Sequence, residues 1–167
     1  GMAGYKGFFY HFLDMETGNR WSRDVELSSI DTTLCLAGAL SAGAYFDRDD
    51  LAEAEVRDLA TKLYERVDWR FMQPRPDRVA MAWHPESGFG VADWNGYDES
   101  MILYVLALGS PTFPATDGAW EVFCSTYRWA EHEGQTYLNF APLFGHQFSH
   151  AWIDFRGIRD GFMRGKG

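Results

Sequence analysis

The sequence predicts a mainly α-helical fold in which inner and surface helices alternate. Two helical segments, at about 29–46 and 98–108, are apolar on nearly every side, and a third, at about 144–155, mixes apolar and polar residues. Two more, at about 51–67 and 118–131, have an apolar face and a charged face. This order is typical of helix hairpins with inner and outer layers, as in an α/α toroid or solenoid.

The segment before the first helix is expected to be irregular or to contain short strands. Gly7–Leu13 is rich in aromatic residues and Asp14–Arg20 resembles a turn, so together they favour a small β-hairpin. Gly1, before Met2, is interpreted as the remnant of a cleaved tag. A chain of 167 residues predicts a single domain over residues 1–167.

Local signals support the ends of two helices. Asp49 or Asp50 is placed to cap the second helix, and Pro111 and Pro114 follow the third. The connector from Asp68 to Tyr97 is long and rich in proline and glycine, with a short strand expected at 78–83. Long loops in compact domains are usually functional.

Composition limits the classes of partner. The net charge of −9 argues against nucleic acid and against anionic membrane surfaces, because both require a basic face. No apolar run reaches about 18 residues, so no membrane span is expected. Aromatic residues make up 17% of the chain, and they fill cores or form the walls of sugar-binding clefts. A neutral glycan therefore fits this chain best.

The two cysteines, Cys35 and Cys124, lie in helical segments without the spacing of a metal site. We interpret them as buried thiols, and a disulfide between them stays open as an alternative.

Two acidic residues begin inner helices and are the candidate catalytic residues. In a toroid, helices of one layer run parallel, so Asp31 and Glu99 should project toward one cleft. Trp94 and Tyr97, which precede Glu99, would lie at the same end. A pair of carboxyl groups flanked by aromatic rings suits glycoside hydrolysis, in which one protonates the leaving oxygen and the other activates water or attacks.

A structural interpretation competes with this one. Ser28 and Asp31 match a capping box with Asp in place of the usual Glu or Gln, and any acid in a first helical turn is favoured by the helix dipole. A helix N-terminus also favours the ionised carboxylate, whereas a general acid must hold its proton. Burial beside Trp94 and Tyr97 would have to outweigh that effect.

His146, His150 and Asp154 recur every four residues and could face a metal ion. Gln147 stands where a zincin motif requires Glu, so hydrogen-bonding residues beside the cleft are favoured and no metal or other cofactor is expected. Serine hydrolase chemistry has no local signature here.

Several long strings resemble the glycoamylase-like domain family, which is related to (α/α)6-barrel endo-β-1,2-glucanases. They are GFFYHFLDMETG, ELSSIDT with LAGAL, LYERVDW, YDESMILYVLALGSPT and PLFGHQFSHAWIDFRG. The resemblance implies a partial (α/α)6 toroid and hydrolysis of β-glucan, with β-1,2 linkage and inversion favoured. A periplasmic or cell-envelope location is also implied.

The resemblance also implies roles for individual residues. Glu99 resembles the proposed general acid of the family, and Asp31 lies where relatives have a functionally important acid. The residues placed around the cleft to bind substrate are Trp83, Trp94, Tyr97 and His146.

The chain resembles only the N-terminal half of the barrel. A competing expectation is therefore that the chain is a non-catalytic half-domain that binds glycan or assembles with another chain. An open toroid edge would expose apolar surface and favour a homo-oligomer or pairing with another chain.

Overall fold

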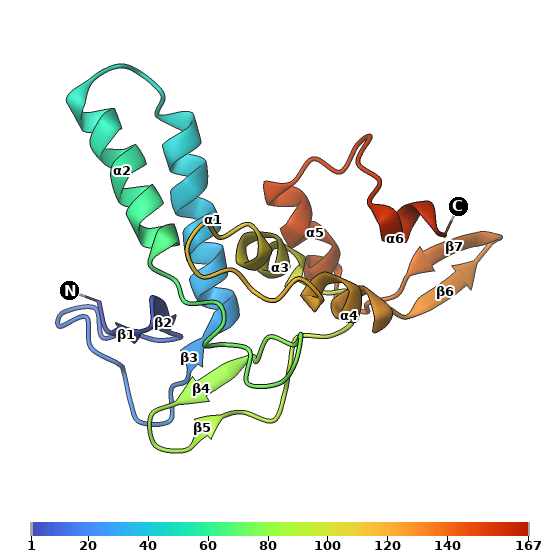
Figure 1. Ribbon diagram of the computed structural model, residues 1–167, viewed down its shortest axis with the longest axis horizontal. Helices are drawn as coiled ribbons and strands as arrows, with labels where there is room; N and C mark the ends of the chain where they lie inside the picture. Colours follow the sequence, from blue (N-terminus) through green and yellow to red (C-terminus); the bar gives the residue numbers. More distant parts are fainter. Residues whose placement is uncertain (1, 167) are drawn as a thin grey trace.

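The computed structural model describes residues 2–166, so Gly1, predicted to be a tag remnant, lies outside the described residues. Figure 1 shows a small sheet near the N-terminus, a long hairpin of two helices, and shorter helices with a second β-hairpin toward the C-terminus. The helices are α1 (Ser29–Tyr45), α2 (Leu51–Glu65), α3 (Met101–Leu108), α4 (Ala119–Ser125), α5 (Leu143–Trp152) and α6 (Gly161–Arg164). The strands are β1 (Gly4–Tyr5), β2 (Phe8–Tyr10), β3 (Leu27–Ser28), β4 (Ala82–His84), β5 (Gly88–Phe89), β6 (Trp129–His132) and β7 (Gln135–Leu138).

The first five strands form one antiparallel sheet in the order β1-β2-β3-β4-β5. The expected turn at Asp14–Arg20 is present and is closed by an antiparallel bridge between Leu13 and Arg20. A second hairpin, which the sequence did not predict, joins β1 to β2 through a turn at Lys6 and Gly7. Gly7 has φ +88°, and a Cβ there would lie 2.6 Å from backbone atoms of Arg66 and Val67, so only glycine fits this turn. The central strand, β3, passes directly into α1, which fixes the start of that helix.

Helices α1 and α2 confirm the two strongest helix predictions. Asp50 caps α2 by accepting the N–H of Glu53 at 3.0 Å. The expectation that α1 is buried on every side was wrong, because α2 and α3 cover only part of its surface. The interpretation of both cysteines as buried thiols is confirmed for Cys124 on α4 but was wrong for Cys35, which is exposed on α1, and both thiols are free.

The later helices gather around α3. Helix α3 contacts α1, α4 and α5, and α2 packs on α1. The third helix begins at Met101, three residues later than expected, because Asp98 to Ser100 form a turn ahead of it. The fifth helix, expected at 144–155, spans Leu143–Trp152.

The fourth helix, expected at 118–131, ends at Ser125, and the chain then forms the β6–β7 hairpin. Glu133 and Gly134 both have positive φ, which is the backbone of a two-residue hairpin turn. The apolar residues have helical spacing, but the turn at Glu133 and Gly134 determines that this segment forms a β-hairpin.

The core lies between the sheet, α1 and α3. Its largest fully buried side chains are Trp69, Tyr104, Phe8, Phe123, Leu27, Leu36, Met72 and Leu103. Trp69 and Phe8 meet edge to face, with ring centroids 5.3 Å apart. The connector at 68–97 thus contributes to the core as well as linking α2 to α3. Across residues 2–166, none of the helices has both the length and the apolar character that crossing a membrane requires.

Candidate active site

Asp31 lies in the first turn of α1 and takes part in its cap. Ser28 Oγ accepts the N–H of Asp31 at 3.1 Å and donates to Asp31 Oδ2 at 2.5 Å. Ser28 therefore caps α1 as predicted, but the Asp31 carboxylate returns to the Ser28 hydroxyl and not to its backbone N–H, so half of the capping box is formed. The Asp31 side chain is 39% exposed, so its carboxylate is capped and still faces solvent.

A histidine lies between Asp31 and a second carboxylate. His11 Nδ1 lies 2.6 Å from Glu26 Oε1, and His11 Nε2 lies 3.5 Å from Asp31 Oδ2. Burial raises the pKa of Glu26, but a hydrogen bond from its own backbone and the hydrogen bond and charge of His11 outweigh burial and lower it overall. The start of α1 thus carries a row of three ionisable groups.

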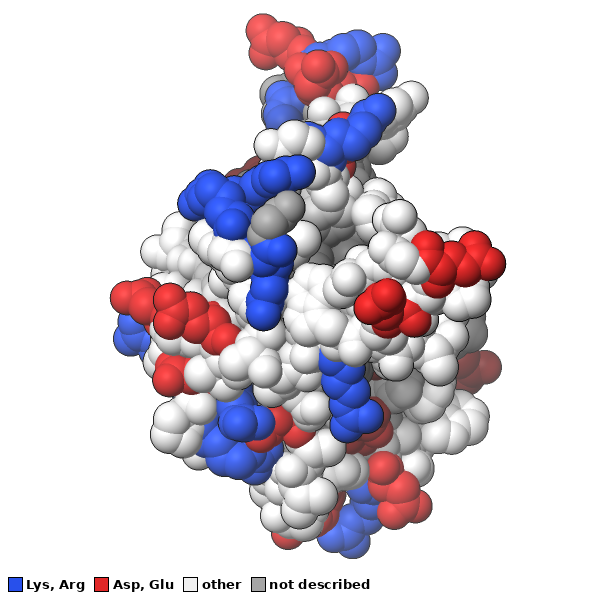
Figure 2. Space-filling view, turned by 90° about the vertical axis from the view of Figure 1, so that its right-hand side faces the viewer, with Lys and Arg blue, Asp and Glu red and all other residues white. Residues whose placement is uncertain are grey.

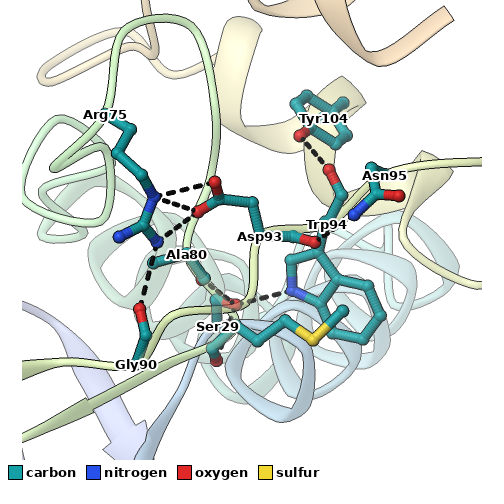
Figure 3. A network of polar contacts seen from close by, with 9 residues as sticks. Ser29, Arg75, Ala80, Gly90, Asp93, Trp94, Asn95 and Tyr104 are labelled. Atoms are coloured by element: carbon teal, nitrogen blue, oxygen red, sulfur yellow. Dashed lines mark hydrogen bonds and ion pairs between the residues drawn. The ribbon is translucent and has the colours of Figure 1, made fainter. Parts of the chain in front are cut away.

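The loop before α3, residues 90–100, is anchored by an ion pair and by backbone bonds. Arg75 Nε donates to both carboxylate oxygens of Asp93 at 2.8 Å, and Arg75 Nη2 donates to the Gly90 carbonyl at 3.2 Å. The Trp94 N–H donates to the Val79 carbonyl at 2.9 Å. Figure 3 shows Arg75 reaching Asp93 and Gly90 on one side of the network.

Trp94 joins this loop to the first residue of α1. Its indole N–H donates to Ser29 Oγ at 2.9 Å, and Ser29 Oγ donates to the Ala80 carbonyl at 2.8 Å. The Tyr104 hydroxyl of α3 donates to the Trp94 carbonyl at 2.9 Å (Figure 3). The segment that leads to Glu99 is therefore tied to the end of α1 that carries Asp31.

Glu99 is half-buried and stands two residues before α3, not within its first turn as expected. Its Oε2 atom is buried and has no hydrogen-bond partner among the described residues. Buried carboxylate oxygens are normally hydrogen-bonded, so an unpartnered one needs an explanation. An oxygen prepared to meet a ligand is one such explanation.

Asp98, beside Glu99, is an ionisable group that the sequence interpretation did not select. It is 6% exposed, and its Oδ1 accepts the N–H of Ser100 at 2.9 Å and the Ser100 hydroxyl at 2.5 Å. Burial raises the pKa of Asp98 to about 6, with a further contribution from the charge of Glu99, despite the opposing bonds from Ser100. Because the folded-state value lies above 3.8, ionised Asp98 opposes folding.

Replacing Asp98 with Asn is expected to stabilise the protein by about 1–2 kcal/mol at pH 7. A rise of roughly two pKa units corresponds to about 3 kcal/mol, and the buried amide of Asn would offset part of it. As the pH falls from about 6 to below 3.8, Asp98 is protonated in both the folded and the unfolded state and no longer opposes folding. The free energies of unfolding of the wild type and Asp98→Asn should therefore converge below pH 3.8. Urea denaturation at pH 7 and pH 4 measures the difference, with exposed Asp117→Asn as the control. Equal stability at pH 7 would contradict the prediction.

Tyr97 and His146 are brought together, with ring centroids 5.1 Å apart. Tyr97 is only 7% exposed, and burial together with the charge of Asp98 raises its pKa. His146 Nε2 lies 2.9 Å from the Phe140 carbonyl, which the ring can satisfy only as a donor. His146 therefore supports the loop of Tyr97 from α5.

A surface hollow of about 330 Å³ opens beside Tyr97. It is lined by Asn95, Gly96, Tyr97, Arg128, Asn139, Phe140 and Ala141. Amide groups, a guanidinium and aromatic rings in one concavity are suited to hydrogen-bond and stack on a small polar ligand such as a sugar.

The other two predicted substrate-binding residues, Trp94 and Trp83, do not line this hollow. Trp94 is 9% exposed, which leaves little of its ring for stacking. Trp83 lies on β4 in a separate aromatic group, stacked on Tyr5 with ring centroids 5.2 Å apart and packed against Phe71. The structure gives no contact between Trp83 and Tyr97 or His146.

The three residues considered for metal binding point to different partners. His146 contacts the Phe140 carbonyl, His150 packs on the ring of Phe155, and Asp154 pairs with Arg156. Among residues 2–166, no group of three or more His, Cys, Asp or Glu residues has a geometry suited to a metal ion.

Comparison with known proteins gives the chain a family context. Residues 92–166, which include Glu99, match the family model named Glycoamylase and described as "Putative glucoamylase". A curated relative from Parabacteroides distasonis, exo β-1,2-glucooligosaccharide sophorohydrolase (non-reducing end), is 25% identical over 158 residues. That match covers 84% of this chain and 22% of the relative.

Solved structures show the same fold. The endo-β-1,2-glucanase of Chitinophaga pinensis, solved with sophorotriose and glucose, matches 96% of this chain with a TM-score of 0.86 and 22% identity. A glucoamylase-like protein of Bacteroides uniformis matches 96% with a TM-score of 0.86 and 24% identity. In both cases the chain covers 42% of the larger structure. The resemblance to the glycoamylase-like family is thus confirmed, and the chain spans less than half the length of these relatives.

Proposed function

We propose, because the chain resembles the glycoamylase-like family, that it is a glycoside hydrolase domain for β-glucan with β-1,2 linkages. The observation that carries the proposal is Glu99. Its buried Oε2 has no partner, and its loop is tied through Trp94 to the start of the helix that bears Asp31. The relatives named for β-1,2-glucan activity support the choice of linkage.

The proposed reaction is acid/base hydrolysis with inversion. Glu99 protonates the glycosidic oxygen as the bond to the anomeric carbon breaks. Asp31 accepts a proton from the water that attacks the opposite face of the sugar ring. Asp31 suits the second role because its carboxylate is partly exposed and already held by Ser28.

The proposed substrate site is the hollow beside Tyr97. Asn95, Arg128 and Asn139 offer hydrogen bonds to sugar hydroxyls, and Phe140 offers a ring face. Tyr97, Trp94 and His146 hold the loop that forms one wall. Trp83 would meet only a longer glucan that extends toward the sheet.

The proposed architecture is one domain that forms part of an (α/α)6 toroid. Helices α1, α3 and α5 would be its inner layer, since α3 contacts both of the others, and α2 and α4 would be outer helices. The N-terminal sheet and the β6–β7 hairpin would then cover one end of the inner helices.

The direct test is incubation of the chain with β-1,2-glucan while reducing ends are measured. A β-1,3-glucan serves as the linkage control. Proton NMR of the first products gives the anomer, and inversion predicts that newly formed reducing ends appear in the α configuration. No reducing ends from β-1,2-glucan, with the protein folded, would reject the catalytic proposal.

A second candidate function is assembly with another chain. On α5, Phe144, Phe148 and Trp152 recur every four residues, and they are 42%, 39% and 37% exposed. Figure 2 views the side on which Figure 1 places β6, β7 and α6, and much of that surface is uncharged. A stripe of large apolar side chains on one helix favours a second copy of the chain as its partner.

Self-association through this stripe gives a testable expectation. The wild-type chain should dimerise at micromolar concentration in analytical ultracentrifugation, and Phe148→Asp should weaken dimerisation by at least about tenfold. Leu59→Asp on α2, where Leu59 is 51% exposed, is the matched control and should behave as the wild type. A monomeric wild-type chain would contradict this assignment.

A further inference from the structure

The group at the start of α1 contains two residues to which the proposed reaction has so far given no role. His11 comes from the segment after β2, and Glu26 directly precedes β3. His11 lies 20 residues before Asp31 and Glu26 five residues before it, and the ring of His11 lies between the two carboxylates, with Glu26 at 2.6 Å and Asp31 at 3.5 Å. The ring also stacks on Phe12, with centroids 4.2 Å apart, which limits its rotation.

The Glu26 contact determines which ring nitrogen carries the proton. A carboxylate oxygen can only accept, so a contact of 2.6 Å requires a hydrogen on His11 Nδ1. In the neutral ring, Nε2 then has a lone pair, and Nε2 lies 3.5 Å from Asp31 Oδ2. A carboxylate that fixes the tautomer of a histidine and stabilises its charged form is a recurrent arrangement in hydrolases.

We propose that Glu26 and His11 position Asp31 and remove its proton during each turnover, an inference that rests on the proposed glycoside hydrolysis. As water attacks the anomeric carbon, one O–H bond of the water breaks and its proton passes to Asp31 Oδ2. The proton then moves to the lone pair of His11 Nε2, and Asp31 regains its negative charge. Glu26 stabilises the imidazolium.

The exposure of His11 allows the proton to leave for solvent. Its side chain is 36% exposed, so the imidazolium can release the proton to solvent. The distance of 3.5 Å between Nε2 and Asp31 Oδ2 is longer than a hydrogen bond, and such contacts commonly shorten when substrate binds. His11 thus acts through Asp31 and is a positioning residue.

NMR of the ligand-free protein tests the arrangement without any substrate. Long-range ¹⁵N–¹H spectra at a pH where His11 is neutral should show the Nδ1–H tautomer in the wild type. In Glu26→Met the Nε2–H tautomer should increase, since the side-chain acceptor of Nδ1–H is lost. The ¹³C resonance of the Asp31 carboxyl should move in His11→Gln. It should stay in place in His132→Gln, the matched control, because His132 lies on β6 and its ring pairs with the exposed Glu133 at 3.9 Å.

Kinetics on β-1,2-glucan provide a second measurement. His11→Gln should lower kcat by about tenfold or more with KM within twofold, while His132→Gln should match the wild type. A predominant Nε2–H tautomer in the wild type, an unmoved Asp31 resonance, or an unchanged kcat would overturn the inference. If the wild-type chain does not cleave glucan, the proposed function fails on its own, and the two NMR measurements still decide whether His11 positions Asp31.

Discussion

Glu99→Gln is expected to lower kcat on β-1,2-glucan by about 10²–10⁴-fold, because the amide cannot donate a proton to the leaving oxygen. The exchange keeps the size of the side chain and gives the buried Oε2 position an amide group in place of an unpartnered carboxylate oxygen. The free energy of unfolding should therefore change little. Initial rates of reducing-end formation and isothermal titration with sophorose oligomers measure the two effects separately.

The control for this experiment is Glu55→Gln, an exposed glutamate on α2, which should leave the rate unchanged. Retained binding of the oligomers by Glu99→Gln would place the loss in the chemical step. If Glu99→Gln hydrolyses glucan at the wild-type rate, Glu99 is not the acid, and the neighbouring Asp98 becomes the candidate to test next.

Arg75→Met is expected to cost about 3 kcal/mol of stability. The Asp93 side chain is only 9% exposed, and Arg75 donates to both of its oxygens, so the variant leaves a buried carboxylate without its partner. The partial exposure of Arg75, 36%, places the cost at the lower end of the range for buried pairs. Guanidinium denaturation measures the loss.

A double-mutant cycle separates the pair from the desolvation of Asp93. Arg75→Met with Asp93→Leu should recover most of the stability, because no buried charge is left. Arg156→Met removes a short contact to Asp154 that lies at the surface, and it should leave the free energy of unfolding nearly unchanged. A loss no larger for Arg75→Met than for Arg156→Met would show that the anchor of the 90–100 loop is not energetically important.

The fold was predictable where local signals agreed with packing. The one-sided apolar pattern and capping aspartate of α2 gave its start at Leu51, and the capping box at Ser28 gave the start of α1. The pattern failed at 126–131, where the chain leaves α4 and enters β6. There the positive φ of Glu133 and Gly134 and pairing with β7 decide the structure, and periodicity carries no information about either.

The candidate site was predictable only in part, for a similar reason. Asp31 and Glu99 could be selected because each is near the start of an apolar helix. His11 lies 20 residues before Asp31 and gives no local signal, since the sheet alone brings it there. Asp98 was adjacent to a selected residue, and its Asp-x-Ser spacing is typical of a turn that precedes a helix, so this signal could have been used.

The bond from the Trp94 indole to Ser29 has a consequence for how substrate enters. Many enzymes close a mobile lid over a small substrate and wait for it to open. The loop before Glu99 is held to α1 through Ser29, to residue 79 through its backbone and to α3 through Tyr104, so it cannot swing as a lid without breaking all three. Under the proposed function, a glucan chain would slide past a fixed edge, and loop closure is not expected to limit the rate of turnover.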